Sequence, residues 1–97
     1  MRYSFHPEAE VELNDAVDYY EKQQENLGLE FAEEVYDTIQ RILAFPNAWQ
    51  LLEDNIRRCM TRRFPFGVIY YERADTIVIL AVMQLNRKPG YWQKRKK

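Results

Sequence analysis

The chain has few of the residues on which several kinds of site depend: among its 97 residues are one cysteine, one histidine and three glycines. Cys59 alone cannot form an internal disulfide or a multi-thiolate metal site, and its place in a strand pattern predicts a buried, reduced thiol. No glycine-rich phosphate loop, metal-ligand spacing or internal repeat occurs along the sequence. We therefore expect no metal, no cofactor and no small-molecule substrate.

The sequence also lacks a hydrophobic run long enough to cross a membrane. Its longest apolar run is residues 77–83, whereas a membrane helix needs roughly 20 such residues. The first five residues lack the apolar core of a secretory signal. A hydrophobic fraction of 46% excludes a disordered chain. Together these properties predict one domain, residues 1–97, in the cytoplasm and without a membrane contact.

Basic residues are scarce in the first half of the chain, and acidic residues are scarce in the second half. Residues 8–37 hold eleven acidic residues against Lys22 alone, and residues 57–97 hold eleven basic residues against Glu72 and Asp75. Either the two groups merely solvate separate surfaces, or the basic half faces an anionic partner, which would be nucleic acid or an acidic protein segment.

The hydrophobic pattern predicts a strand, two helices and three more strands. Residues 3–5 form a short strand, and His6-Pro7 then starts a helix with His6 at its cap. Residues 26–28 break this helix, and a second one runs from about residue 29 to Phe45-Pro46. Residues 47–55 are predicted as a loop. Strands follow at residues 57–63, 66–72 and 77–83, and the last two form a hairpin.

This order predicts an α+β fold in which a helical hairpin covers one face of a small, mostly antiparallel four-stranded sheet. The opposite face is expected to be open and to carry two arginines of strand 57–63, since alternate residues of a strand point to opposite faces. An open face on so small a domain is where a partner docks. We expect Tyr91 and Trp92 to pack the basic tail onto the sheet, and residues 94–97 to form a frayed, solvated end.

Several segments carry a family resemblance in their order and spacing. They are FHPEA at residues 5–9, Tyr19-Tyr20, LGLEF at residues 27–31, Pro46, Arg57, FPF at residues 64–66, IYY at residues 69–71, Arg87 and PGYW at residues 89–92. Over nearly the whole chain, the sequence resembles the RelE/ParE superfamily of type II toxin–antitoxin toxins. The resemblance implies the β-α-α-β-β-β fold of that superfamily and neutralisation by a cognate antitoxin. It also implies one of two targets, because RelE-like members cleave messenger RNA on the ribosome and ParE-like members inhibit DNA gyrase.

The residues present favour the ParE-like, non-catalytic alternative. An endonuclease of the RelE type would use Arg58, Arg62, Arg87 and Tyr91, but Met60 stands where a second lysine is expected. Gly67 and Gln84 likewise stand where relatives have arginine and histidine. Cleavage by the 2′-hydroxyl needs a group that takes a proton, and arginine is a poor base near neutral pH.

Three hypotheses follow from this resemblance. The first is a toxin that binds a protein target such as gyrase, the second is a ribosome-dependent mRNA endonuclease, and the third is an inactive relative that only binds an antitoxin. For binding of the antitoxin or target, we predict this set of residues: Arg57, Arg58, Arg62, Arg63, Arg87 and Trp92.

Overall fold

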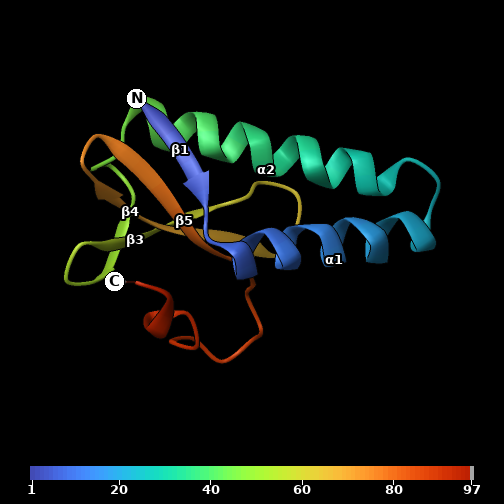
Figure 1. The fold of residues 1–97 in the computed structure, drawn as a ribbon. Coiled ribbons are helices and arrows are strands. Elements are labelled where there is room, and N and C mark those ends of the chain that lie inside the picture. Colours follow the sequence, from blue (N-terminus) through green and yellow to red (C-terminus); the bar gives the residue numbers. More distant parts are fainter. Residues whose placement is uncertain (97) are drawn as a thin grey trace.

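The computed structural model describes residues 1–96 and arranges them as a helical hairpin against a sheet (Figure 1). The elements are β1 (Arg2–Phe5), α1 (Pro7–Gln23), α2 (Leu27–Ala44), β2 (Gln50–Glu53), β3 (Ile56–Met60), β4 (Phe66–Arg73), β5 (Thr76–Gln84) and a 3₁₀ turn, η1 (Gln93–Arg95). The five strands lie in the order β1-β5-β4-β3-β2. β1 pairs with β5 in parallel, and the other neighbours are antiparallel. The predicted α+β class is confirmed.

The predicted number of strands is wrong by one. Residues 50–53, which we expected in a loop, form β2 and pair with β3 at the edge of the sheet. Three of the four residues are exposed and only Leu52 is half-buried. A strand without an alternating buried side gives no periodic signal, so pairing with β3 decides its conformation.

The helical hairpin forms where the sequence predicts it, except that α2 begins at Leu27, inside the break predicted at residues 26–28. The Nδ1 atom of His6 accepts a hydrogen bond from the backbone N–H of Glu8 at 3.1 Å and caps α1, as expected. At the start of α2, a Cβ atom on Gly28 would lie 2.5 Å from the carbonyl oxygen of Val17. Glycine is therefore needed at this position for the two helices to approach so closely.

The core lies on both sides of the sheet. Between the sheet and the helices, buried residues of α2, β4 and β5 surround Phe31, Ile39 and Val68. A second buried cluster lies on the opposite face, and it consists of Ile56, Ile69, Tyr71, Leu80, Ala81, Met83 and Trp92. The bulge of β5 opposite Ile69 and Tyr70 lets Leu80 and Ala81 both join this second cluster.

The C-terminal segment covers part of the face that we expected to be open. Trp92 is only 2% exposed and packs into the second cluster with Tyr91 beside it, so its predicted role as an anchor is confirmed. The expectation of a frayed end is wrong for Arg95, whose side chain is 9% exposed, and for Lys96, which bonds to the side chain of Asn55. Lys97 lies outside the described residues.

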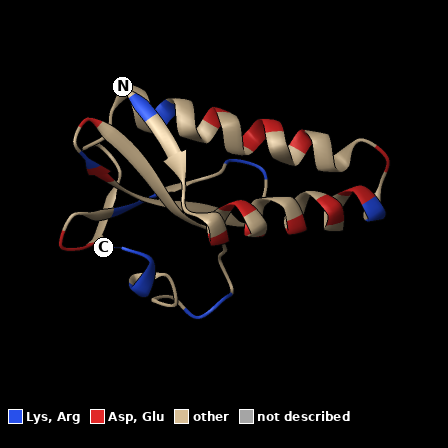
Figure 2. Ribbon diagram, in the orientation of Figure 1, with Lys and Arg blue, Asp and Glu red and all other residues tan. Residues whose placement is uncertain are grey.

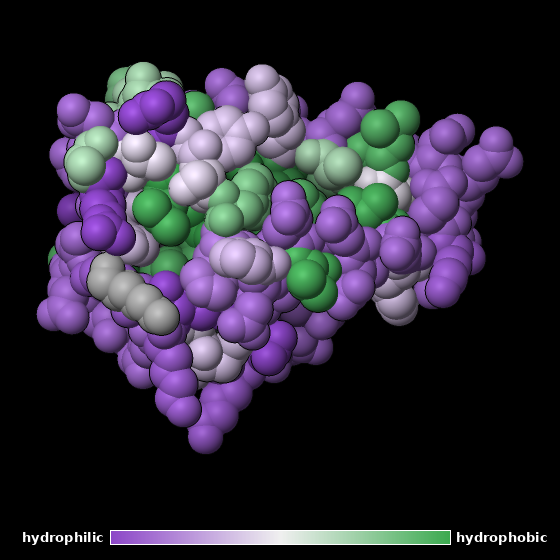
Figure 3. Space-filling view, viewed as in Figure 1, coloured by the Kyte–Doolittle hydropathy of each residue, from purple (hydrophilic) through white to green (hydrophobic). Residues whose placement is uncertain are grey.

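Opposite charges occupy different parts of the structure. Figure 2 shows acidic residues along both helices and basic residues in the C-terminal segment and in the loop before β4. In the same orientation, hydrophobic residues gather in the middle of the surface, inside a mostly hydrophilic border (Figure 3). The charge division read from the sequence is therefore also a division in space.

A buried tyrosine makes the stability of this fold sensitive to alkaline pH. Tyr70 is 1% exposed, its hydroxyl donates a hydrogen bond to the carbonyl oxygen of Pro46 at 2.6 Å, and burial raises its pKa from 10.0 to about 12. Because the folded state holds this proton more tightly, the stabilisation is complete below pH 10 and is lost as the pH rises towards 12. We expect the free energy of unfolding, measured with urea, to fall between pH 9 and pH 11.5, and to fall less in Tyr70→Phe. Equal losses in the two proteins would contradict the assignment to Tyr70.

Candidate functional site

The first two arginines of the predicted set lie on opposite faces of β3. Arg57 points to the side of the helices and donates a hydrogen bond to the carbonyl oxygen of Trp49 at 2.8 Å. Arg58 points to the other face and donates to Oε1 of Gln50 at 2.6 Å. Its stem lies across Gly67, where a Cβ atom would be 2.9 Å from the Cδ of Arg58. The glycine that replaces an expected arginine therefore makes room for Arg58.

The next two arginines lie outside the sheet, in the loop between β3 and β4. Glu34 of α2 accepts the backbone N–H groups of Arg62 and Arg63 at 2.5 and 2.6 Å, which holds the loop against the helix. Arg63 also forms an ion pair with Glu30 at 2.8 Å. Arg62 is exposed, and within residues 1–96 its guanidinium group has no hydrogen-bond or ion-pair partner. The prediction that a strand carries these two residues is wrong, because β3 ends at Met60.

A carboxylate near the end of β5 connects three distant parts of the chain. Oε1 of Glu12 accepts the backbone N–H of Val82 at 3.0 Å and a guanidinium N–H of Arg95 at 2.9 Å, while Oε2 accepts a second Arg95 N–H at 3.1 Å. Arg95 also donates to the carbonyl oxygen of Leu80 at 2.9 Å. β1 ends at Phe5, which pairs with Ile79. Glu12 and Arg95 therefore bond to the stretch of β5 that lies beyond the reach of β1.

Sequence reasoning did not find Glu12 or Arg95. The two residues are 83 positions apart, and each belongs to a segment rich in its own charge. The one available signal was their opposite charge, which many other pairs in this chain share.

Arg87 and Tyr91 lie together beside this carboxylate. The guanidinium carbon of Arg87 is 3.5 Å from the centre of the Tyr91 ring, and its Nη1 is 3.6 Å from Oε2 of Glu12. Burial, and secondly the neighbouring Glu12, raise the pKa of Tyr91 above its ordinary value. A phenol whose pKa is raised stays protonated at neutral pH, so almost none of it is present as the phenolate that could take a proton.

The four residues of the predicted nuclease set do not form one cluster of contacts. Arg87 and Tyr91 touch, whereas Arg58 bonds to β2 and Arg62 lies in the loop that Glu34 holds. Trp92, from the binding set, is buried and does not present its ring to solvent. The expectation of one open face that carries the arginines is therefore wrong. The arginines lie on both sides of the sheet, and several of them have acidic or carbonyl partners within the fold.

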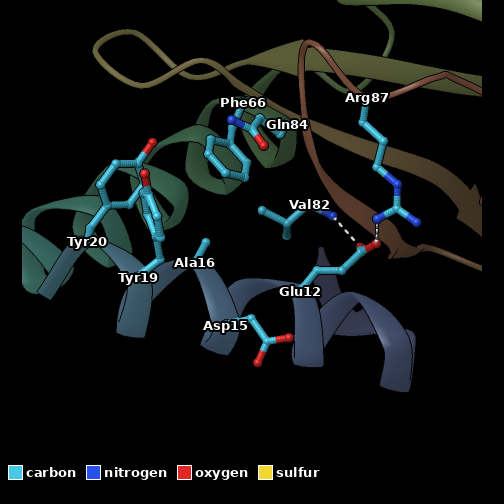
Figure 4. Close-up of a pocket in the computed structure, with 9 residues that line it drawn as sticks. All are labelled: Glu12, Asp15, Ala16, Tyr19, Tyr20, Phe66, Val82, Gln84 and Arg87. Atoms are coloured by element: carbon cyan, nitrogen blue, oxygen red, sulfur yellow. Dashed lines mark hydrogen bonds and ion pairs between the residues drawn. The ribbon is translucent and has the colours of Figure 1, made fainter. Parts of the chain in front are cut away.

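A hollow of about 390 Å³ lies between α1 and the ends of β4 and β5 (Figure 4). We call it the α1–β5 hollow. Its residues are Glu12, Asp15, Ala16, Tyr19, Tyr20, Phe66, Val82, Gln84 and Arg87. Figure 4 shows the two tyrosines at one end and the Glu12–Arg87 pair at the other.

Two further properties bear on the kind of site. Within residues 1–96, no three histidine, cysteine or acidic side chains are grouped so that they could hold a metal ion. In the same part of the chain, neither helix combines the length and hydrophobicity that a membrane span requires.

Comparison with known proteins identifies the family. The model of the ParE toxin of the type II toxin–antitoxin system parDE matches residues 3–89. A solved structure described as the chromosomal ParDE toxin–antitoxin system from P. aeruginosa has the same fold, with a TM-score of 0.77 at 18% identity, covering 89% of this chain and 97% of that one. Comparison with curated protein sequences gave no significant match. Because the family model spans most of the sequence, the chain belongs to the ParE toxin family of type II toxin–antitoxin systems, within the RelE/ParE superfamily.

Proposed function

We propose that this toxin acts in the cytoplasm by binding a protein target such as DNA gyrase, and that a cognate antitoxin neutralises it. The choice between binding and catalysis rests on Tyr91, because it is the one residue of the nuclease set that could act as a base. Its pKa is raised by burial and by Glu12, and Arg87 covers its ring. The other three members are arginines, which stabilise negative charge but do not take a proton.

The surface supports a binding function. Four large hydrophobic side chains on the two helices are more than half exposed: Val11, Tyr19, Leu29 and Tyr36. A protein partner that covers these side chains would remove apolar surface from water, which favours association. Antitoxin binding is supported on the same grounds, since an amphipathic segment could cover these side chains and order itself as it binds.

Purified gyrase provides the direct test. We expect the toxin to inhibit supercoiling of relaxed plasmid at micromolar concentration, and the protein expressed from a neighbouring antitoxin reading frame to restore it. No inhibition at that concentration would reject the gyrase target. Primer extension on messenger RNA from induced cells tests the alternative, because new 5′ ends during growth arrest would indicate an endonuclease. Normal growth with folded toxin present would indicate an inactive relative.

Among the predicted binding residues, Arg62 gives the sharpest test because its side chain is exposed and unpaired within residues 1–96. We expect Arg62→Glu to weaken binding of the antitoxin or gyrase by about three- to tenfold, since reversing a charge at the rim of an interface introduces repulsion. Calorimetric titration measures the affinity, and circular dichroism checks the fold.

Arg73 provides the matched control for this substitution. It is also an exposed arginine, but it lies at the end of β4 beside the turn to β5. Arg73→Glu changes the net charge by the same amount and is expected to bind within about twofold of the parent. If both variants lose affinity equally, net charge and not a contact of Arg62 accounts for the effect.

A further inference from the structure

We propose that the α1–β5 hollow is the binding site for an arginine side chain of a protein partner. The hollow combines three properties that a guanidinium group on an aliphatic stem requires: an apolar floor, aromatic rings and an unpaired carboxylate. Lysine shares the charge but lacks the planar group that stacks on a ring and bonds a carboxylate through two N–H groups.

The floor and one end of the hollow are apolar or aromatic. Val82 and Phe66 are 3% and 8% exposed, and Ala16 of α1 completes the apolar floor beside them (Figure 4). Tyr19, which is 59% exposed, and Tyr20 stand at one end with their rings in an edge-to-face arrangement 5.3 Å apart. The methylene stem of an arginine could cover this floor while its guanidinium group meets a tyrosine face.

The negative charge of α1 favours a cation in the hollow. Asp15 is exposed and has no hydrogen-bond or ion-pair partner in the described part of the chain. α1 carries six acidic residues against Lys22. Glu12, by contrast, is already bonded to Arg95 and to Val82. An incoming guanidinium group would therefore pair with Asp15 and not displace Arg95.

Arg87 does not oppose this occupant. Its guanidinium group is 3.6 Å from Glu12 and lies over the Tyr91 ring. Figure 4 shows it turned towards Glu12, at the end of the hollow away from the tyrosines. The amide of Gln84 lines the hollow as well and offers a carbonyl acceptor.

We assign the arginine to the antitoxin segment that docks on α1, and this assignment rests on the proposed function. The preference of the hollow for a guanidinium group does not depend on that assignment. A small probe therefore tests the hollow separately from the antitoxin. If the protein binds the probe but no antitoxin, that result would contradict only the proposed function.

The probe is N-acetyl-arginine methylamide, titrated into the whole protein and followed by NMR. We expect saturable shifts of the Tyr19 and Tyr20 ring signals and of the Asp15 amide signal. N-acetyl-citrulline methylamide has nearly the same shape without the charge, and we expect it to bind at least about threefold more weakly. The acidic probe N-acetyl-aspartate methylamide is expected to cause no saturable shift of these signals.

Two substitutions on α1 form the matched pair. Asp15→Asn is expected to weaken binding of the arginine probe by about three- to fivefold. Asp18→Asn removes the same charge from an exposed residue that does not line the hollow, and it is expected to leave the affinity within about 1.5-fold of the parent. Both sites are exposed, and unchanged signals elsewhere verify the fold. Equal binding of arginine and citrulline, tighter binding of the aspartate probe, equal effects of the two substitutions, or no saturable shift would each overturn the proposal.

Discussion

Replacing Trp92 with alanine is expected to lower the free energy of unfolding by about 3–5 kcal/mol, the usual cost of removing a large buried aromatic side chain. Trp92 is 2% exposed and lies among Ile56, Ile69 and Met83, on the face of the sheet opposite the helices. Without it, the C-terminal segment loses its main apolar contact and the second core cluster opens to water. Denaturation with urea, followed by circular dichroism, measures the loss.

Two variants separate packing from other roles of this side chain. The indole N–H has no hydrogen-bond partner within residues 1–96, so Trp92→Phe loses volume but no hydrogen bond and is expected to cost only about 1–2 kcal/mol. Leu85→Ala is the control, because Leu85 follows β5 and is 37% exposed. It is expected to lower the free energy of unfolding by less than about 1 kcal/mol. A stable Trp92→Ala protein that fails to bind the antitoxin or gyrase would instead support a direct contact, as the sequence suggested.

Replacing Glu12 with alanine is expected to have an effect of similar size, about 3–5 kcal/mol. The substitution leaves the Arg95 guanidinium group, whose side chain is 9% exposed, without its bidentate partner. It also removes the acceptor of the Val82 N–H. In the described part of the chain, the guanidinium group then keeps only the carbonyl oxygen of Leu80 and, at 3.7 Å, Glu8 as hydrogen-bond or ion-pair partners. A nearly buried charge that loses its bidentate carboxylate is costly because little water replaces it.

A double substitution tests this explanation. Glu12→Leu combined with Arg95→Met removes both charges and keeps most of the apolar volume, so it is expected to be more stable than Glu12→Ala by at least about 1 kcal/mol. Glu8→Ala is the control, because Glu8 is 3.7 Å from Arg95 but its side chain is 68% exposed; it is expected to change stability by less than about 0.5 kcal/mol. If Glu8→Ala costs as much as Glu12→Ala, the loss reflects the charge of α1 and not the buried pair.

The failures of the sequence predictions have a common physical cause. β2 has no buried alternation, so only its pairing with β3 makes it a strand. The loop at Arg62 and Arg63 continues the basic pattern of β3, and the carboxylate that ends the strand there comes from α2, 28 residues away. The α1–β5 hollow likewise combines α1 with residues of β4, β5 and the segment after β5. No local pattern could have combined them.

The sequence by itself determined the helical hairpin, the three central strands, the separation of charge and the family, because periodicity, caps, breaks and short motifs act over a few neighbouring residues. Only the tertiary structure decided the edge strand β2, the residues that surround Trp92 in the second cluster and the pairing of Glu12 with Arg95. These features depend on which distant segments meet. That choice is made by the burial of apolar surface and the pairing of desolvated charges in the whole fold, and a local pattern contains neither.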